Sequence, residues 1–500
     1  MPRVPLLAGS GVAVLNVPDD AVVLRPPPPG QVVADVAAAV REALRFPLEG
    51  PPLEQVVRGA SSVTIVVELP SLPIPGAPSD PRQAALEGAS DELERVGVPS
   101  ERQTLLVAGG LARRAGPADI SLLAAPEFRR RFRGRVVVHD VEDPALVDVG
   151  AAGSVPLRVN RAIVEPDAVV VVTAAETVVH GGPSALVAAA GAEAVRAAGA
   201  WSLVETAASQ GWQVATALER AVAARVPLIG VSLVLNHPQL VASSLRGFPY
   251  DEHTTERIAG STLRRALALI PGPIRARMIR SLRRDLTAAG VFAGPPAVAH
   301  AEALVRAIAT REVVLEEPLD AIVVGIPPTT LHLPRELPNP LNAAQLGLGV
   351  ALRLWRDAFP VVEGGTAIIV HPFRRRFAHP TQQPYRTFFA ATRYGRAPEE
   401  LLAAERVIAE DQPALAAYRE GRTCHPLLPF ADWESCRPAL VRLGAVLVAG
   451  CRDSVAARQL GLVPTHGLNA ALEMARGRAD GTPRIGVLLA PPYFPIRLGQ

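Results

Sequence analysis

The sequence predicts an α/β protein built from two α/β domains with mainly parallel sheets and a cleft between them. Short runs of β-branched residues alternate with helical segments along most of the chain, which is typical of parallel sheets covered by helices. This alternating pattern is found both before and after a domain boundary that we place near residues 301–310. With 500 residues, 49% of them hydrophobic, the chain is long enough to bury two cores.

The first predicted domain covers residues 1–300. The stretches "GVAVLNV" and "AVVLRP" flank Pro18-Asp19-Asp20 and predict a hairpin that ends in the stiff tetraproline Pro26–Pro29. A helix is expected in "QVVADVAAAVREALRF", then a strand in "SSVTIVVEL" and a helix from Pro81 to Val96. Further strands are predicted at "RQTLLVAGG", "GRVVVHDV" and the apolar "PDAVVVVTAA".

The second predicted domain covers residues 301–500 and repeats the pattern. Its strands are predicted at "LDAIVVGIPP", "GGTAIIVHPF", "GAVLVAGCRD" and "RIGVLLAPPY". Before it lies an arginine-rich region, residues 244–296, which predicts one helix with two opposite faces: Arg277, Arg280 and Arg284 on one, Met278, Ile279 and Leu282 on the other. Such a helix is either a solvated outer surface or a docking surface for a membrane or a partner.

The composition excludes several kinds of chemistry. All 51 basic residues are arginine, so there is no lysine for a Schiff base, a P-loop or a covalent cofactor link. The arginines are mixed with 48 acidic residues, which does not indicate a nucleic-acid partner. No apolar run approaches the ~20 residues of a membrane helix, and the first residues lack signal-peptide features, so we expect no membrane span and a cytoplasmic location. Three widely spaced cysteines indicate core or surface thiols.

The stretch "TVVHGGPSALVAAAG" is the clearest candidate for a binding site. It follows a predicted buried strand and precedes an alanine-rich helix. Gly181-Gly182 lets backbone amides approach a ligand at the positive end of that helix, and Pro183 suits its first position. The alternative is that the two glycines only make a tight turn between strand and helix, because a glycine pair alone is a weak signal.

The order of these segments resembles that in the nickel-pincer lactate racemase family. The stretches that carry the resemblance are "ALRFPLEGPPLEQVVRGASSVTIVV", "LLVAGGLARRAGPADI", "VVVHDVEDPALVDVG", "HGGPSALVAAAG" and "FPVVEGGTAIIV". The likeness extends over most of the chain and is more specific in its N-terminal half; residues 244–296 look like an insertion. The resemblance implies two α/β domains with a cleft between them. It also implies an ancestral racemisation of a 2-hydroxy acid through hydride transfer on a nickel-pincer nucleotide.

Most functional residues of that family are replaced in this chain. Its Asp-x-Thr-Arg-Pro stretch, which grips the substrate carboxylate, appears as 69–73, "LPSLP", with Leu72 in the arginine's place. Its Gly-x-His-Arg stretch appears as 110–113, "GLAR", so Ala112 replaces the general base and Arg113 remains. Where its lysine anchors the cofactor covalently, this chain has Ser184 after Gly181-Gly182.

The remaining family positions leave His180 as an ambiguous survivor. It either takes the role of the family's second catalytic histidine or caps the turn before the glycines. The nickel-ligating histidine has no counterpart, since residues 192–211 contain none. We therefore predict that no pincer cofactor can be attached covalently, that no metal site is kept, and that Gly181, Gly182 and Ser184 form whatever cofactor cradle is left.

Arginine and histidine gather instead in "HPFRRRFAHPTQQPYR", which follows a predicted strand where ligands of open sheets bind. This stretch is either an exposed soluble loop or a new grip on an acidic ligand by His371, Arg374, Arg376 and His379, facing the Gly181-Gly182 turn. Two functions follow. The chain is a racemase or epimerase of a 2-hydroxy acid with a rebuilt site, in which His180 and Arg113 take part in catalysis, or it is a non-catalytic relative that binds a nucleotide or acidic metabolite.

Overall fold

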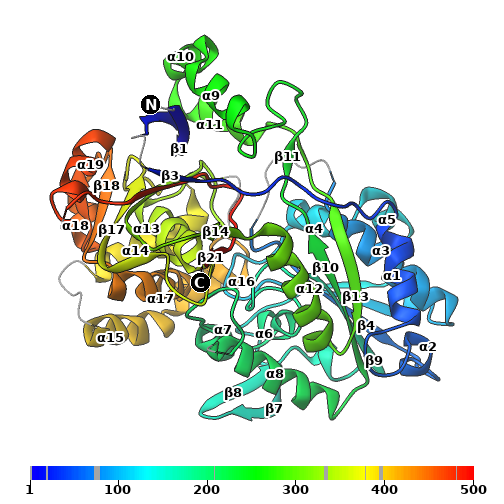
Figure 1. Ribbon diagram of the computed structural model, residues 1–500. Coiled ribbons are helices and arrows are strands. Elements are labelled where there is room, and N and C mark those ends of the chain that lie inside the picture. The colour runs from blue at the N-terminus through cyan, green and yellow to red at the C-terminus, as the bar shows by residue number, and fades with distance from the viewer. Residues whose placement is uncertain are drawn as a thin grey trace.

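A computed structural model of the chain describes residues 3–17, 21–72, 79–207, 209–331, 336–377, 379–392, 398–479 and 481–499. The chain folds into two α/β units that lie side by side (Figure 1). Each unit consists of a six-stranded sheet and the helices that cover it, and we call these units the first and the second layer. This confirms the predicted α/β class and the predominance of parallel strands. None of the helices in the described ranges is long and apolar enough to cross a membrane.

The first sheet has the order β13-β10-β9-β4-β5-β6 and is parallel except for β13. Its strands are β4 (Val63–Glu68), β5 (Gln103–Ala108), β6 (Arg135–Val138), β9 (Ala168–Ala174), β10 (Leu228–Leu235) and β13 (Ala288–Gly294). Successive side chains of β4 point to opposite faces, so Ile65 packs in one core and Val66 in the other. Both faces are buried, which explains why these strands are nearly continuous runs of valine, isoleucine and leucine.

Helices cover both faces of the first sheet. One face is covered by α1 (Val36–Arg45), α2 (Leu53–Val56), α3 (Pro81–Arg95), α4 (Pro117–Leu123) and α5 (Pro126–Arg131). The other face is covered by α6 (Ser184–Ala188), α7 (Ala192–Ala197), α8 (Gln210–Ala223) and the hairpin β7 (Val147–Ala152)–β8 (Val155–Val159). Helix α12 (Pro296–Arg311) packs on β10 and β13, so the first layer continues past the boundary predicted near residue 300.

The second sheet has the order β19-β18-β17-β15-β20-β3, and all its strands are parallel. They are β3 (Val22–Leu24), β15 (Leu319–Gly325), β17 (Val361–Val370), β18 (Ala445–Ala449), β19 (Val463–Thr465) and β20 (Ile485–Leu488). One face packs on α13 (Pro340–Ala344), the π-helical turn η3 (Gln345–Val350), η4 (Ala351–Arg353), α14 (Gln383–Ala391), α17 (Leu428–Arg442) and α18 (Ser454–Gln459). The other packs on α19 (Leu468–Arg476) and on β1 (Arg3–Ala8) and β2 (Gly11–Asn16).

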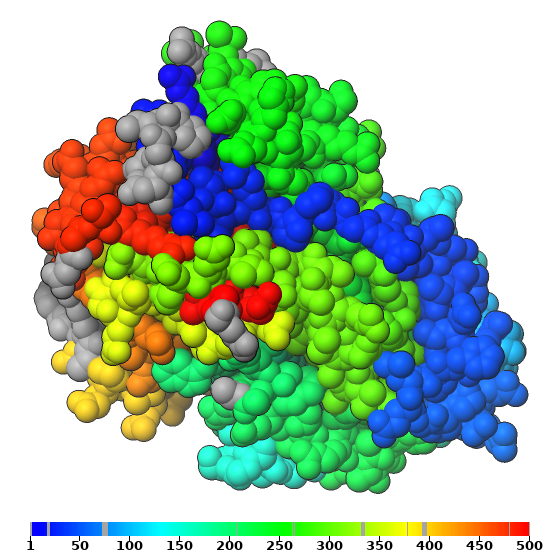
Figure 2. Space-filling model, in the orientation of Figure 1, coloured from blue at the N-terminus to red at the C-terminus, as the bar shows by residue number. Residues whose placement is uncertain are grey.

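The predicted hairpin at the start of the chain is wrong. Strand β1 pairs with β2 across Gly9 and Ser10, whereas "AVVL" forms β3 and pairs with β20 of the second sheet. The turn Pro18-Asp19-Asp20 lies outside the described residues. After β3 the segment with Pro26–Pro29 crosses the face of the molecule to α1 (Figures 1 and 2). The chain thus forms one strand of the second sheet, β3, before it forms any strand of the first. The predicted domain bounds 1–300 and 301–500 therefore separate the strands of the two sheets only in the part of the chain from α1 onward.

Residues 244–296 do not form the single helix that was expected. They fold into α9 (Glu252–Gly260), α10 (Thr262–Leu269) and α11 (Gly272–Arg280), followed by β12 (Arg284–Asp285), which pairs with β11 (Gln239–Leu240), and by β13. Because α11 ends at Arg280, Leu282 and Arg284 lie beyond the helix. Helices α9 to α11 stand at one end of the molecule beside the β1–β2 hairpin (Figure 1).

The remaining elements join or flank the two layers. Strands β14 (Val313–Leu315), β21 (Ile496–Leu498) and β16 (Trp355–Arg356) form a small parallel sheet, and α15 (Pro398–Ala409) and α16 (Gln412–Arg419) precede α17. Contacts between the layers include the ion pair of Arg196 with Glu405 at 2.6 Å. Cys424 and Cys436 are buried and Cys451 is partly exposed, all three as free thiols, as expected.

Candidate functional site

A cavity of about 560 Å³ lies between the two layers. On the first layer it is lined by the ends of β4 and β5, the turn after β9, and α6 and α7; on the second it is lined by η3, η4 and α17. The carboxyl ends of parallel strands therefore open into it, which is the usual position of ligands in open α/β sheets. We refer to it as the cleft cavity.

Glu68 lies in the first-layer wall of the cleft cavity, and a second carboxyl group, that of Glu176, lies close to it without lining the cavity. Glu68, at the end of β4, accepts a hydrogen bond from the Gly181 amide at 2.9 Å. Burial raises the pKa of Glu68 to about 8, and the nearby negative charge of Glu176 adds to this. A carboxyl group that exchanges its proton near neutral pH can serve as an acid or a base.

Glu176 is held as the charged partner of this pair. Its Oε1 lies 2.6 Å from Arg82 Nη2, and its Oε2 accepts hydrogen bonds from the Ser71 amide at 2.8 Å and the Ser71 hydroxyl at 2.5 Å. Burial alone would raise the pKa of Glu176, but Arg82 and Ser71 outweigh it and lower the pKa. The pKa of Glu68 is thus raised and that of its neighbour Glu176 is lowered, and such opposite shifts are common in sites that move protons.

The expectation that Gly181 and Gly182 cradle an anion stays a prediction. Their amides already donate to Glu68 and to Thr173 Oγ1, the latter at 2.8 Å. Both residues have positive φ, +107° and +53°, and a Cβ on Gly182 would lie 2.3 Å from His300 Cβ. The glycines are therefore required by the turn and by close packing on His300, as the alternative interpretation held.

Ser184 also serves the turn. Its hydroxyl donates to the Val178 carbonyl at 3.2 Å, and it begins a helix of only five residues, α6. The backbone amides of Gly181 and Gly182 and the hydroxyl of Ser184 thus already have partners within the protein, although Ser184 still lines the cleft cavity.

His180 lies in the wall of the cleft cavity and in a tight turn. Its Nδ1 is 2.7 Å from Thr177 Oγ1, and the two residues also exchange backbone hydrogen bonds. This contact is the capping role that the sequence offered as one alternative. The catalytic role of His180 stays a prediction.

Arg113 lines the same cavity beside Ala112. Its Nη2 lies 2.5 Å from Asp119 Oδ2, and its Nη1 donates to the Arg114 carbonyl at 3.1 Å. Because Asp119 already compensates its charge, Arg113 is a weaker anchor for an incoming anion than an arginine without a carboxylate partner.

The loop with His371, Arg374, Arg376 and His379 does not face the glycine turn. None of its described residues lines the cleft cavity. His371 is buried and its ring lies against Gly9 in the β1–β2 turn, where burial lowers its pKa to about 3. The loop therefore lies away from the cleft cavity, and its grip on an acidic ligand stays a prediction.

The other charged residues of the loop point to solvent or to local partners. Arg374 and Arg376 are exposed, and Arg375 pairs with Asp453 at 2.9 Å. His379 is exposed too, and its Nδ1 lies 3.1 Å from Glu336 Oε1 and 2.7 Å from Thr381 Oγ1. The alternative interpretation, an exposed arginine-rich loop, fits these positions.

Helix α17 and η3–η4 face the first layer instead. Asp432 is buried and accepts hydrogen bonds at 2.5 Å from both Gln345 Nε2 and the Tyr385 hydroxyl. Burial and Asp432 raise the pKa of Tyr385 well above its usual value, so the hydroxyl stays protonated and donates. This network holds α17 and η3 together at the cleft.

Arg353, at the end of η4, is the most informative residue on this side. It is 5% exposed and lines the cavity. Its Nε donates to the Trp201 carbonyl at 3.1 Å and its Nη1 to the Ser435 carbonyl at 3.4 Å. Among the described residues no carboxylate lies within ion-pair distance of it, and burial lowers its pKa to about 10. A buried guanidinium bonded only to carbonyl groups favours the approach of an anion.

Sequence reasoning missed Glu68 and Arg353. Glu68 is the penultimate residue of the quoted stretch "SSVTIVVEL", and a carboxylate at the carboxyl end of a predicted parallel strand is a usable signal. Arg353 in "ALRLW" gives no such signal, because it is one arginine among many and its burial depends on how the two layers meet.

The nickel-pincer nucleotide does not fit the residues of this cleft. Its phosphate would need the Gly181-Gly182 amides, which Glu68 and Thr173 occupy, and its covalent link would need a lysine, which the sequence lacks. No group of three or more histidine, cysteine or acidic side chains in the described parts of the chain is arranged to hold a metal ion.

Comparisons with known proteins agree with this fold. Residues 9–206 match the family model of the lactate racemase N-terminal domain. The lactate racemase apoprotein from Thermoanaerobacterium thermosaccharolyticum is similar over 99% of this chain and 100% of its own, at 14% identity and a TM-score of 0.60. A protein from Thermotoga maritima is similar over 94% of this chain and 99% of its own, at 12% identity and a TM-score of 0.51.

No curated protein matches the chain in sequence. The two kinds of similarity nevertheless agree with the order of motifs in the sequence. Residues 9–206 match the model of the lactate racemase N-terminal domain and the chain has the fold of the lactate racemase apoprotein, which agrees with the resemblance to that family seen in the sequence.

Proposed function

We propose that this divergent lactate racemase-like protein binds a small carboxylate metabolite in the cleft cavity without a nickel-pincer cofactor. The observation that carries the proposal is Arg353, a buried guanidinium at the cavity wall without a carboxylate partner among the described residues. A ligand carboxylate would offset the cost of burying this charge. Other polar groups on the wall, Asp432 and Glu68 among them, would accept or exchange hydrogen bonds with a hydroxyl of the ligand.

A phosphorylated ligand fits this cleft less well than a carboxylate. The glycine turn, where a phosphate would be expected, uses its amides for Glu68 and Thr173. The cavity of about 560 Å³ is ample for a small acid. We therefore prefer an acidic metabolite to a nucleotide.

The experiment is a screen of 2-hydroxy acids and dicarboxylates by thermal shift, followed by calorimetric titration of any acid that stabilises the protein. In Arg353→Gln the affinity should fall roughly ten- to a hundredfold, because a charge-assisted hydrogen bond contributes ~1.5–3 kcal/mol. Arg374→Gln, which changes an exposed arginine, is the matched control and should bind as the unaltered protein does. An equal loss in both variants, or none in either, would contradict the proposal.

Racemisation or epimerisation of a 2-hydroxy acid at the same cleft is the second candidate. It is favoured by Glu68, with a pKa of about 8, and by His180, which lines the same wall. A carboxyl group with that pKa can carry a proton at neutral pH. The test is incubation of enantiopure 2-hydroxy acids in D₂O, with chiral chromatography for inversion and mass spectrometry for deuterium at C2. Turnover that disappears in Glu68→Gln would support catalysis, and the absence of turnover with an acid that binds would support the non-catalytic function.

A further inference from the structure

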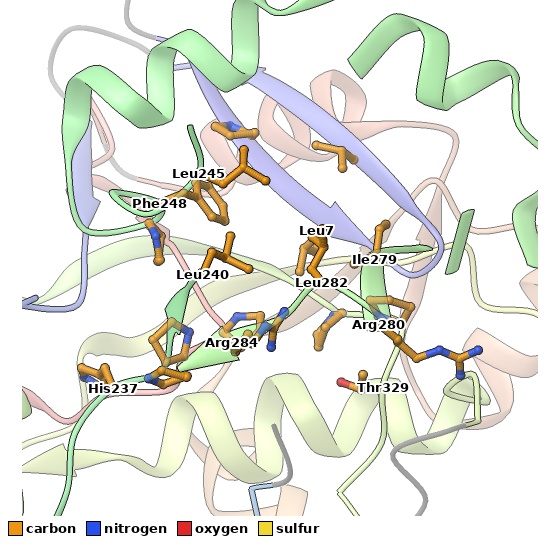
Figure 3. Close-up of a pocket in the computed structure, with 18 of the residues that line it drawn as sticks. Leu7, His237, Leu240, Leu245, Phe248, Ile279, Arg280, Leu282, Arg284 and Thr329 are labelled. Carbon is orange, nitrogen blue, oxygen red and sulfur yellow. The ribbon is translucent and has the colours of Figure 1, made fainter. Parts of the chain in front are cut away.

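A second cavity, of about 600 Å³, lies where residues 236–286 meet the β1–β2 hairpin. Its wall is completed by the segments Pro327–Leu331 and Pro491–Tyr493 and by Arg311 at the end of α12. In Figure 3 the side chains of Leu7, Leu240 and Leu282 lie between His237 on one side and Arg280 on the other. We refer to it as the hairpin cavity.

The hairpin cavity is separate from the cleft cavity. Of the described residues only Leu331 lines both, and Glu176 lines the hairpin cavity while its partner Ser71 lines the cleft. Much of the new wall comes from residues 244–286, the part of the chain that looks like an insertion relative to the lactate racemase family.

The lining is mostly aliphatic. Besides Leu7, Leu240 and Leu282 it includes Val12, Leu235, Leu245, Phe248, Ile258, Leu267, Ile270, Met278, Ile279 and Leu286. Hydrophobic surface left around a hollow of this size loses packing contacts that an apolar ligand would restore. The two opposite helix faces that the sequence predicted are not formed, because Met278, Ile279, Arg280 and Arg284 all line this one cavity. Their shared cavity explains why this stretch is both apolar and basic.

The charges of the lining are strongly unbalanced. Four guanidinium groups belong to it, those of Arg264, Arg280, Arg284 and Arg311, whereas Glu176 is its one carboxylate among the described residues and is engaged by Arg82 and Ser71. Among the described residues, Arg311 donates to the carbonyl groups of Ala307 at 3.0 Å and Ala175 at 3.5 Å. Burial lowers the pKa of Arg311 to about 10 and also lowers that of Arg284.

Two buried polar atoms at this wall have no hydrogen-bond partner among the described residues. They are Nε2 of His237, which is 4% exposed, and the hydroxyl oxygen of Tyr493. Burial lowers the pKa of His237 to about 3, so its ring is neutral. Unsatisfied buried polar atoms are rare, and the oxygens of a ligand carboxylate would accept hydrogen bonds from the Tyr493 hydroxyl and from an Nε2–H of the neutral His237 ring.

We propose that the hairpin cavity binds a fatty carboxylate, with its alkyl chain among the leucine and isoleucine side chains and its head group at the arginine residues. The net positive wall selects an acid over an alcohol or an amine of the same length, and the aliphatic wall selects a long chain over a short one. The proposal is independent of the function proposed for the cleft cavity, because the two sites use different residues.

The test is calorimetric titration of the full-length protein with octanoate, decanoate and dodecanoate below their micelle concentrations. The affinity should rise about fourfold per added CH₂ group until the chain fills the cavity. Dodecanol and dodecylammonium should each bind at least tenfold more weakly than dodecanoate. Equal binding of acid, alcohol and amine would overturn the assignment of the head-group site, and no binding of any of them would overturn the proposal.

Two variants locate the ligand. Arg284→Gln should weaken dodecanoate binding about tenfold, whereas the exposed neighbour Arg283, which does not line the cavity, serves as the matched control in Arg283→Gln. Leu282→Trp should block the cavity and abolish binding. If Leu282→Trp does not fold, the comparison of the two arginine variants still decides, since equal binding by both would contradict the proposal.

A free fatty acid and an anionic membrane lipid both have an alkyl chain and an anionic head group. We favour the free acid because the site is a cavity rather than a flat surface. Co-sedimentation with vesicles of phosphatidylcholine and phosphatidylglycerol separates the two sources. Dodecanoate binding without co-sedimentation supports a free ligand. Co-sedimentation without dodecanoate binding would replace it with a membrane surface.

Discussion

The glycine pair after β9 offers the sharpest test of whether this turn is structural. In Gly182→Ala the new Cβ would meet His300 Cβ at 2.3 Å, at a backbone φ of +53°. The left-handed conformation costs a residue with a side chain about 1–2 kcal/mol. Forcing His300 out of its packed position adds about 1–3 kcal/mol. The free energy of unfolding should therefore fall by about 2–5 kcal/mol.

Gly153, in the β7–β8 turn, is the matched control. Its φ is +61°, and an added Cβ would meet nothing within 4 Å. Gly153→Ala should therefore cost only the conformational part, about 1–2 kcal/mol. Urea unfolding followed by circular dichroism and by tryptophan fluorescence measures both variants, and Trp212, stacked on His300 at 6.0 Å, reports on the turn itself. If Gly182→Ala were no less stable than Gly153→Ala and instead lost affinity for anions, the turn would be a binding cradle and the structural account would be refuted.

Three further predictions concern Glu68, the exposed arginine-rich loop and the missing lysine. The pKa of Glu68 in the folded protein, about 8, exceeds its ordinary value of 4.5, so ionisation of Glu68 opposes folding. The free energy of unfolding should therefore fall as the pH rises from about 4.5 to 8, by at most ~1.4 kcal/mol per pH unit. Glu68→Gln should reduce this fall, as measured by urea unfolding at each pH. Arg374→Ala, at an exposed position, should leave the melting temperature within about 1 °C, since exposed charges contribute little, and a larger drop would mean that this loop is packed. Protein produced together with pincer-cofactor biosynthetic enzymes should keep the mass of the bare chain after denaturation, because it has no lysine to form the link; a heavier covalent adduct would contradict this.

The elements that sequence patterns predicted well are those whose signal is local. The strands "SSVTIVVEL", "RQTLLVAGG", "GRVVVHDV" and "PDAVVVVTAA" appear as β4, β5, β6 and β9, and the helix from Pro81 to Val96 appears as α3, Pro81–Arg95. Burial on both faces produces continuous apolar runs, which are visible without a structure. The start of the chain was mispredicted because strand pairing is not local: β3 pairs with β20, more than 450 residues later in the chain.

The candidate site was less predictable, for a related reason. Gly181-Gly182 has the composition of an anion-binding turn, but which acceptor its amides find depends on Glu68, a residue from another strand. The loop from His371 to Arg386 has the composition of an anion site as well, yet α17, η3 and η4 face α6 and α7 across the cavity, and this puts Arg353 at the cleft instead. Composition indicates what a segment could bind, whereas the arrangement of the layers decides which segments meet.

The most direct test of the central claim is the effect of Arg353→Gln on ligand-induced stabilisation of the cleft. The unaltered protein, Arg353→Gln and Arg374→Gln are each titrated with the 2-hydroxy acids and dicarboxylates of the screen, and the melting temperature is followed against concentration. The account predicts that at least one acid stabilises the unaltered protein and Arg374→Gln to the same extent and no longer stabilises Arg353→Gln. Stabilisation of Arg353→Gln with undiminished affinity, or no stabilisation of the unaltered protein by any acid, would contradict it.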